Sequence, residues 1–311
     1  MKIKELAEGN SIQNMILYCT SKSSATSVKG EYYALTLQDG SGSLPGRVWE
    51  INEYIDQFEA KDFIKVSGAV ASYKGALQIN ITNLDKVDPS TVNIDDFCPK
   101  APRPVEEMWT EFMDLVNSVQ NEYLSKLLHA FFDNEKIASR FKANSAAKTV
   151  HHAYVGGLLD HSLSVAKICD TLANNYPTIN RDLLITVAVL HDIGKIKEIA
   201  AFPENDYTDE GNLLGHIYMG AEMVDIQVRK IDGFPKVLAN EVKHCILAHH
   251  GGLEYGSPKV PALIEATALS FADDTDAKLR RFSDLLADTT DDNWSERQDF
   301  FLNSKFRRTI V

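Results

Sequence analysis

Residues 191–195 read His-Asp-Ile-Gly-Lys and bring three chemically different side chains close together. At helical spacing His191 and Lys195 share one face, with Asp192 beside them. An imidazole and a carboxylate are ligands for divalent metal ions, and an adjacent ammonium suits a phosphate group. The stretch therefore predicts divalent-metal chemistry on a phosphoester.

The distribution of histidine strengthens this prediction. Eight of the nine histidines fall between residues 151 and 250. Together with nearby carboxylates they give an ordered series of candidate ligands: His161, His191, Asp192, His216, the doublet His249-His250, and Asp273. Such a set without thiolate suits manganese, iron, cobalt, nickel or zinc. The set exceeds the needs of one tetrahedral ion, so we expect two ions that share Asp192 as a bridge.

Helices must bring these ligands together. Apolar residues recur at helical spacing through most of residues 106–290, and an unbroken apolar run leads into His191. Near the candidate ligands, helices are expected over residues 158–174, 182–191, 217–230, 235–249 and 262–276. Ligands on separate helices can converge in the core of a bundle. We therefore expect an all-α domain with the metal site inside it.

The first 88 residues follow a different pattern, in which apolar and polar residues alternate and glycines mark the bends. This pattern is typical of antiparallel strands with one wet face. Strands are expected over residues 12–18, 32–37, 43–49, 63–70 and 76–81, with a short helix near residues 52–58. Five strands with a helix between the third and the fourth match the layout of an OB-fold barrel.

The expected fold is therefore multidomain α and β, with an N-terminal five-stranded OB-fold β-barrel at residues 1–88 and a helical bundle at residues 106–290. Residues 89–105 carry four prolines and no periodicity, which predicts a linker. Residues 291–311 form a C-terminal segment that ends in a basic tail.

Part of the barrel sequence carries a resemblance of its own. The stretch "ALTLQDGSGSLPGRVWE" followed by "DFIKVSGAVASYKGALQINI" resembles OB domains that bind single-stranded nucleic acid. Trp49 and Tyr73 could stack on bases, and Arg47 and Lys74 could contact the backbone. Tyr32 and Tyr33 are further candidates, but they face opposite sides of one strand, so we expect at least one of them in the core.

Composition bounds the class of protein. The 311 residues are 44% hydrophobic and 24% charged, which is typical of a soluble globular protein. No apolar run is long enough to cross a membrane, and the first residues lack the apolar core of a signal peptide. The four cysteines are isolated, so we expect reduced thiols in a cytoplasmic protein. A net charge of −12 argues against strong non-specific attraction to nucleic acid.

The ordered ligand series, together with "HDIGK", resembles the HD-domain metal-dependent phosphohydrolases over roughly residues 145–280. The resemblance carries over residue by residue to six metal ligands: His161, His191, Asp192, His216, His249 and Asp273. It favours His249 over His250 because the family's fifth ligand tends to close an apolar helix, here "VKHCILAH". His250 then becomes a group that acts on the substrate or supports the ligands.

The whole chain is similar to the YhaM-type 3′–5′ exoribonucleases, in which an OB domain precedes an HD domain. The stretch "SAAKTVHHAYVGGLLDHSLSVA" carries most of this similarity, and "KTVHHAYVGGLLDH" is its most distinctive part. The resemblance implies two divalent ions, with manganese preferred and magnesium, cobalt, iron or nickel as alternatives. It also implies a single-stranded RNA substrate, with single-stranded DNA as a second candidate, and a homo-oligomeric ring.

Metal-dependent hydrolysis of an RNA phosphodiester bond would assign roles to individual residues. Asp192 would hold both ions, Lys195 would take up charge on the phosphate, and His250 would protonate the departing 3′-oxygen. Lys148, His151 and His152 could hold a neighbouring phosphate. Two other functions stay open: hydrolysis of small nucleotides by the HD site, and single-strand binding without catalysis.

Overall fold

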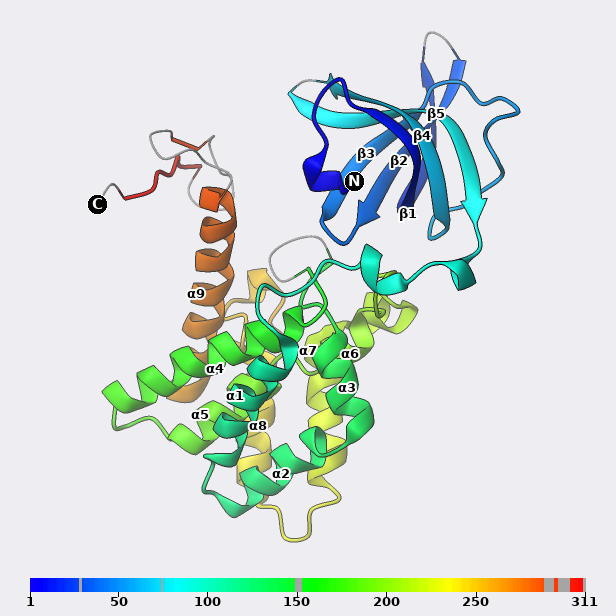
Figure 1. Ribbon diagram of the computed structural model, residues 1–311. Coiled ribbons are helices and arrows are strands. Elements are labelled where there is room, and N and C mark those ends of the chain that lie inside the picture. Colours follow the sequence, from blue (N-terminus) through cyan, green and yellow to red (C-terminus); the bar gives the residue numbers. More distant parts are fainter. Residues whose placement is uncertain (28–29, 74, 149–152, 288–293, 296–302, 310–311) are drawn as a thin grey trace. The chain divides into compact units, whose positions relative to one another are not determined.

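The computed structural model describes residues 1–27, 30–73, 75–148, 153–287, 294–295 and 303–309. The chain divides into two compact units (Figure 1). The first, the barrel unit, is Met1–Lys100 with Ala201–Asn205, and the second, the helical unit, is Ala101–Ala200 with Asp206–Val311. Each unit has its own hydrophobic core.

The barrel unit is a closed five-stranded barrel, as the alternating pattern predicts. Its strands are β1 (Ser11–Ser27), β2 (Gly30–Asp39), β3 (Gly42–Val48), β4 (Phe63–Tyr73) and β5 (Ala76–Val87). Their order around the barrel is β1-β2-β3-β5-β4, with β4 closing on β1. The long strand β1 pairs with both β2 and β4, and its register shifts between Cys19 and Ser21 against β2 and between Ile12 and Met15 against β4. The fold is an OB-fold barrel.

The helix expected near residues 52–58 is absent, and that prediction was wrong. Ile55 and Phe58 lie three residues apart, which is helical spacing, but the backbone here pairs with strand β5 instead. The N–H of Leu84 donates to the carbonyl of Tyr54 at 2.9 Å, and the N–H of Asp56 donates to the carbonyl of Leu84 at 2.9 Å. Phe58 is buried in the barrel core. Tertiary pairing has therefore overridden the local pattern.

Much of the segment expected as a linker packs on the barrel. It contains two short 3-10 turns, Pro89–Thr91 and Ile94–Phe97. The side chain of Gln38 donates to the carbonyl of Phe97 at 2.9 Å, and the ring of Phe97 lies 4.9 Å from that of Phe63. The segment up to Lys100 therefore belongs to the barrel unit.

The helical unit follows the expected periodicity. Its helices are α1 (Val105–Asn117), α2 (Glu122–Phe132), α3 (Glu135–Ala143), α4 (Gly157–Asn175), α5 (Arg181–Leu190), α6 (Lys195–Glu198), α7 (Asp209–Val228), α8 (Lys236–Ala248) and α9 (Ile264–Ala287) (Figure 1). Every residue of α5 from Leu183 to Leu190 is buried, so α5 is the central helix of this core. None of the helices described is both long and apolar enough to cross a membrane.

Two helices depart from the expected bounds. Helix α7 begins at Asp209, before the expected residue 217, and it is broken at Gly215, whose φ of 74° and ψ of 153° are not helical. Helix α9 continues to Ala287, beyond the expected residue 276. The break in α7 matters for the site, because the next residue is His216.

Candidate metal centre

The candidate ligands converge from five helices of the helical unit. His161 lies on α4, and His191 and Asp192 follow directly after α5. The other candidates come from three more helices: His216 from α7, His249 and His250 from the end of α8, and Asp273 from α9. These helices share one apolar core with α5, and this packing positions their polar groups.

Asp192 lies at the centre of this arrangement. Its Oδ2 atom is 3.5 Å from Nε2 of His161 and 3.4 Å from Nε2 of His191. Its Oδ1 atom is 3.5 Å from Nε2 of His216 and 3.8 Å from Nε2 of His249. The two oxygens of one buried carboxylate therefore face two different sets of imidazoles.

These sets form two clusters, each with three ligand atoms within 4.8 Å of one another. Site A consists of His161, His191 and Asp273, and site B consists of His216, His249 and His250. Site B thus contains both members of the histidine doublet. Both histidines can therefore belong to one site, and the geometry does not require a choice between His249 and His250.

Each of the five imidazoles is oriented by a contact at its Nδ1 atom. Backbone carbonyls accept in three cases: His191 to Ala188 at 2.7 Å, His249 to Ile246 at 2.7 Å and His250 to Tyr255 at 3.0 Å. Carboxylates accept in the other two: His161 to Asp276 at 2.7 Å and His216 to Glu198 at 2.9 Å. When neutral, a histidine held in this way carries its proton on Nδ1 and presents the lone pair of Nε2 to a metal.

Several buried polar atoms at the centre lack partners that a metal ion would supply. Among the described residues, Nε2 of His216, Nε2 of His249 and Oδ1 of Asp192 are buried without a hydrogen-bond partner. Nε2 of His161 lies only 3.2 Å from Nε2 of His191, although both Nδ1 atoms already have acceptors. Buried polar groups are rarely left in this state, so the donor set fits divalent ions at both sites.

The charge states of the cluster also favour cations. Burial raises the pKa of the Asp192 carboxyl, but Lys195 and His191 outweigh it and hold that pKa well below its usual range. Burial lowers the pKa of His161, yet hydrogen bonds to Asp273 and Asp276 raise it to about 10. Burial, with the neighbouring imidazoles, lowers the pKa of His249. The surroundings of His161 in site A therefore favour a positive charge, and His249 in site B is a neutral nitrogen ligand.

Lys195, the predicted phosphate contact, lies on the wall of the cavity beside the candidate ligands. Its Nζ atom is 2.7 Å from Oδ2 of Asp192. It is the first residue of the short helix α6. The side chain of Asn144 donates to the carbonyls of Lys195 and Ile199, at 3.3 and 3.0 Å, and so ties both ends of α6 to one residue.

Gly194 explains why this motif needs a glycine before its lysine. A Cβ atom at Gly194 would lie 2.1 Å from the carbonyl oxygen of His216 and 2.7 Å from the backbone nitrogen of Gly220. The turn that carries Asp192 can therefore approach α7 only because residue 194 has no side chain.

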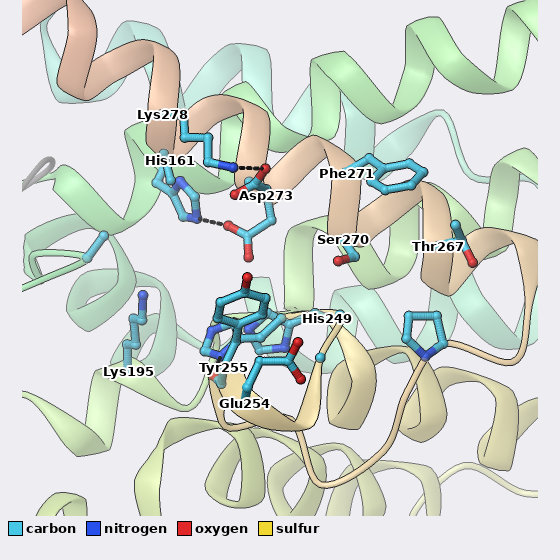
Figure 2. A pocket seen from close by; sticks show the side chains of 17 residues that line it. His161, Lys195, His249, Glu254, Tyr255, Thr267, Ser270, Phe271, Asp273 and Lys278 are labelled. Atoms are coloured by element: carbon cyan, nitrogen blue, oxygen red, sulfur yellow. Dashed lines mark hydrogen bonds and ion pairs between the residues drawn. The ribbon is translucent and has the colours of Figure 1, made fainter. Parts of the chain in front are cut away.

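The ligands open onto a cavity of about 870 Å³ (Figure 2). His161, Lys195, His249, His250 and Asp273 form its metal-facing part. Most of the rest of the wall comes from the loop after α8 and from α9, and includes Glu254, Tyr255, Thr267, Ser270, Phe271 and Lys278. The volume falls within the range of pockets that hold small organic ligands.

The other residues that were predicted to bind substrate in the helical unit either lie away from the described cavity wall or fall outside the described residues. Lys148 is exposed, forms an ion pair with Asp206 at 2.6 Å and is not part of the described cavity wall. His151 and His152 lie outside the described residues, as does Lys74 of the barrel unit.

On the barrel, the structure separates the aromatic candidates. Tyr33 packs toward the core against Phe58, whereas the ring of Tyr32 lies 4.7 Å from that of Trp49. Trp49 is 45% exposed, and its Nε1 atom donates to the side chain of Asn80 at 3.0 Å. Arg47 precedes Trp49 by two residues and pairs with Asn80 across strands β3 and β5. Tyr73 is exposed at the end of β4.

Two functional candidates were missed from the sequence, namely Asp276 and Glu198. Asp276 lies three residues after Asp273, a spacing that puts both on one face of α9. That spacing was a usable signal. Glu198 had none, because its contact with His216 depends on how α6 and α7 pack.

Comparison with known proteins agrees with this architecture. Residues 158–278 match the family model described as the HD domain, and residues 19–87 match the model of an OB-fold nucleic acid binding domain. Among solved structures, the second OB-fold domain of replication protein A from Methanococcus maripaludis is 23% identical, over 30% of this chain and 98% of that one, with a TM-score of 0.24. The chain thus combines an OB-fold nucleic-acid-binding domain with an HD domain, which indicates a metal-dependent phosphohydrolase.

Proposed function

We propose that this protein is a metal-dependent 3′–5′ exoribonuclease that removes nucleoside 5′-monophosphates from single-stranded RNA. One observation carries the hydrolytic part of the proposal: the two oxygens of Asp192 face two separate ligand clusters. The OB-fold barrel, whose family model is of nucleic acid binding domains, supports a polymeric substrate. The resemblance to YhaM-type enzymes supports RNA and cleavage from the 3′ end.

The metal complement that we propose is two divalent ions, with manganese preferred. His161, His191 and Asp273 would hold one ion, His216, His249 and His250 the other, and Asp192 both. Ions bound there would activate water for attack on phosphorus and neutralise charge on the phosphate oxygens.

The geometry favours a ligand role for His250 over the proton-donor role predicted for it. Its Nδ1 atom contacts the carbonyl of Tyr255, so a neutral His250 has its proton there and a bare Nε2 atom. A bare nitrogen can bind a metal but cannot donate a proton. Site B includes this residue because its ligand atom lies within 4.8 Å of those of His216 and His249.

Lys195 is the residue that we assign to the phosphate itself. Burial lowers its pKa, but the carboxylate of Asp192 outweighs that effect and raises it, so the ammonium stays charged. Its position on the cavity wall lets it face a non-bridging phosphate oxygen while it remains anchored to the metal-bridging carboxylate.

On the barrel, we propose that Trp49 and Tyr73 stack on bases upstream of the cleaved end, with Arg47 near the backbone. The exposed ring of Trp49 beside Tyr32 supports this assignment. Lys148, His151, His152 and Lys74 stay proposed phosphate contacts. A homo-oligomer is also part of the proposal, and light scattering on the purified protein tests it.

The deciding experiment uses 5′-labelled RNA and DNA of one single-stranded sequence, incubated with manganese, magnesium or EDTA. A ladder that shortens by one nucleotide from the 3′ end supports the proposal, and Asp192→Ala should abolish it while the fold stays intact. An intact polymer together with hydrolysis of free nucleotides would favour a small-nucleotide hydrolase. Stable binding without cleavage under any metal would favour a binding protein.

A further inference from the structure

Two large aromatic side chains in the helical unit lie exposed within the cavity wall. Tyr255 is 70% exposed and Phe271 is 66% exposed. Tyr255 comes from the loop after α8, and Phe271 comes from α9. Figure 2 shows them on different walls, with Tyr255 beside His249 and Phe271 near Ser270 and Thr267. Exposed aromatic rings that line a concave site are a feature of ligand recognition.

Both rings lie on chain segments that also carry proposed ligands. The carbonyl of Tyr255 accepts the contact from Nδ1 of His250, so this residue orients a proposed ligand of site B while its ring lines the cavity. Phe271 lies on α9, the helix of Asp273, and one helical turn before Asp274, which also lines the cavity. A flat group held against these rings would therefore lie in the cavity onto which the proposed ligands open.

The two walls are also fixed against each other. Gly251 has a φ of +82°, and a Cβ atom there would lie 2.6 Å from Oγ of Ser270. The loop that leads to Tyr255 thus presses directly on α9, one residue before Phe271. The aromatic pair is therefore built on packed backbone, which is how precise binding sites are held.

The charges of the cavity indicate what kind of ligand fits. Its described wall carries Lys195 and Lys278 against the carboxylates of Glu254, Asp273 and Asp274. Lys278 is itself paired with Asp274 at 2.7 Å (Figure 2). Strong attraction for an anion therefore exists only at the metal end, while the aromatic end suits a flat and neutral group. A nucleotide has the same two parts, a charged phosphate at one end and a flat, neutral base at the other.

We propose that Tyr255 and Phe271 form a stacking platform for the base of the 3′-terminal nucleotide, whose phosphate lies at the metal centre. This inference rests on the proposed function and names the part of the substrate that the cavity recognises. Stacking on aromatic rings tolerates every base, so the platform selects for the presence of a base and not for its identity.

The test compares two RNAs that differ only at the 3′-terminal residue, which is adenosine in one and an abasic ribose in the other. The wild-type protein with manganese should release the terminal residue from the base-bearing RNA with a kcat/KM roughly tenfold higher. Tyr255→Leu and Phe271→Leu should each reduce this preference, mainly through KM, and the double variant should lose it. Tyr255→Phe keeps the ring and should retain the preference.

Tyr176→Leu is the matched control, because Tyr176 is a 57% exposed tyrosine at the end of α4 and is not part of the described cavity wall. Manganese content and light scattering are measured for every variant. A preference that persists in the double variant, or a wild-type protein without any preference, overturns the platform. The platform is also overturned if the variants change the oligomeric state but keep the preference for the base-bearing RNA.

A binding measurement separates this inference from the proposed function. Calorimetry with manganese compares adenosine 5′-monophosphate with ribose 5-phosphate, which lacks the base. Roughly tenfold tighter binding of the nucleotide, lost in the double variant, supports the platform even if no RNA is cleaved. Equal binding of the two compounds contradicts the platform even if RNA is cleaved.

Discussion

Glu198 accepts two hydrogen bonds from His216, one from its backbone N–H and one from Nδ1, both at 2.9 Å. The backbone bond is available because α7 is broken at Gly215, which frees the N–H of the next residue. One carboxylate thus secures both the chain and the ring of a proposed ligand. Contacts of this kind contribute strongly to metal affinity.

Glu198→Ala should therefore weaken site B selectively. We expect a loss of about 10- to 100-fold in affinity for the second manganese ion, because Glu198 holds the Nδ1 atom of His216. Metal analysis after desalting should show one ion per chain in place of two. Glu210→Ala, at an exposed position of α7, the helix that carries His216, is the control. Two tightly held ions in the Glu198 variant would contradict this assignment.

Asp276→Ala should have the complementary effect on site A. The carboxylate of Asp276 accepts from Nδ1 of His161 at 2.7 Å and also from the hydroxyl of Ser164. Without it, His161 loses its orientation and site A should lose affinity, whereas site B should keep its ion. Competitive titration with a fluorescent chelator measures both sites, and a variant that weakens both equally would refute the division into two sites.

Manganese should stabilise the folded protein. The unpartnered atoms at the centre gain ligand bonds when ions bind, and binding to the folded state alone raises stability by about 2.7 kcal/mol per site at 100 times Kd. We expect a higher Tm with manganese, which EDTA reverses. Asp192→Asn should show little of this increase. An equal increase in that variant would mean that the ions bind elsewhere.

Gly194→Ala should destabilise the helical unit. The new Cβ atom would overlap the carbonyl of His216, so α6 and α7 would have to separate. A forced backbone shift of this kind costs about 3 kcal/mol. Denaturation by urea should show a lower midpoint, together with weaker metal binding. An unchanged midpoint would show that the contact can relax without cost.

Stability should fall in alkaline solution, in part through Cys19. Burial raises the pKa of this thiol from 9.0 to about 12. Because the folded state favours the protonated thiol, this contribution is complete below pH 9.0 and is lost as pH rises toward about 12. Between pH 8 and pH 10 the loss should approach roughly 1.4 kcal/mol. Guanidinium denaturation at the two pH values should show a smaller loss in Cys19→Ala.

Both folds were predictable from the sequence because their patterns are regular. Alternation defined the strands of the barrel, and the buried run before His191 defined the central helix α5. The candidate ligands could be selected from the sequence because His191, His249 and Asp273 each follow an apolar helical stretch. In the structure the candidates gather into two clusters within one core.

The remaining features depend on tertiary packing. The spacing of Ile55 and Phe58 suggested a helix, but pairing with Leu84 satisfied the backbone in another way. The grouping of His250 with His216 and His249 follows from the turn at the end of α8, where the carbonyl of Tyr255 fixes the ring. No local pattern encodes the contact of Glu198, since its partner lies on another helix.

Carboxylates outnumber lysines in the described cavity wall, so the binding of metal and the binding of a phosphate are thermodynamically coupled. Before cations bind, the buried charge of Asp192 and its neighbours repels a phosphate group, so bound metal should tighten the hold on the proposed RNA substrate. Linkage is reciprocal, and a bound RNA end should therefore tighten the hold on metal by the same factor. Under scarce manganese the protein would retain its ions best while engaged with substrate.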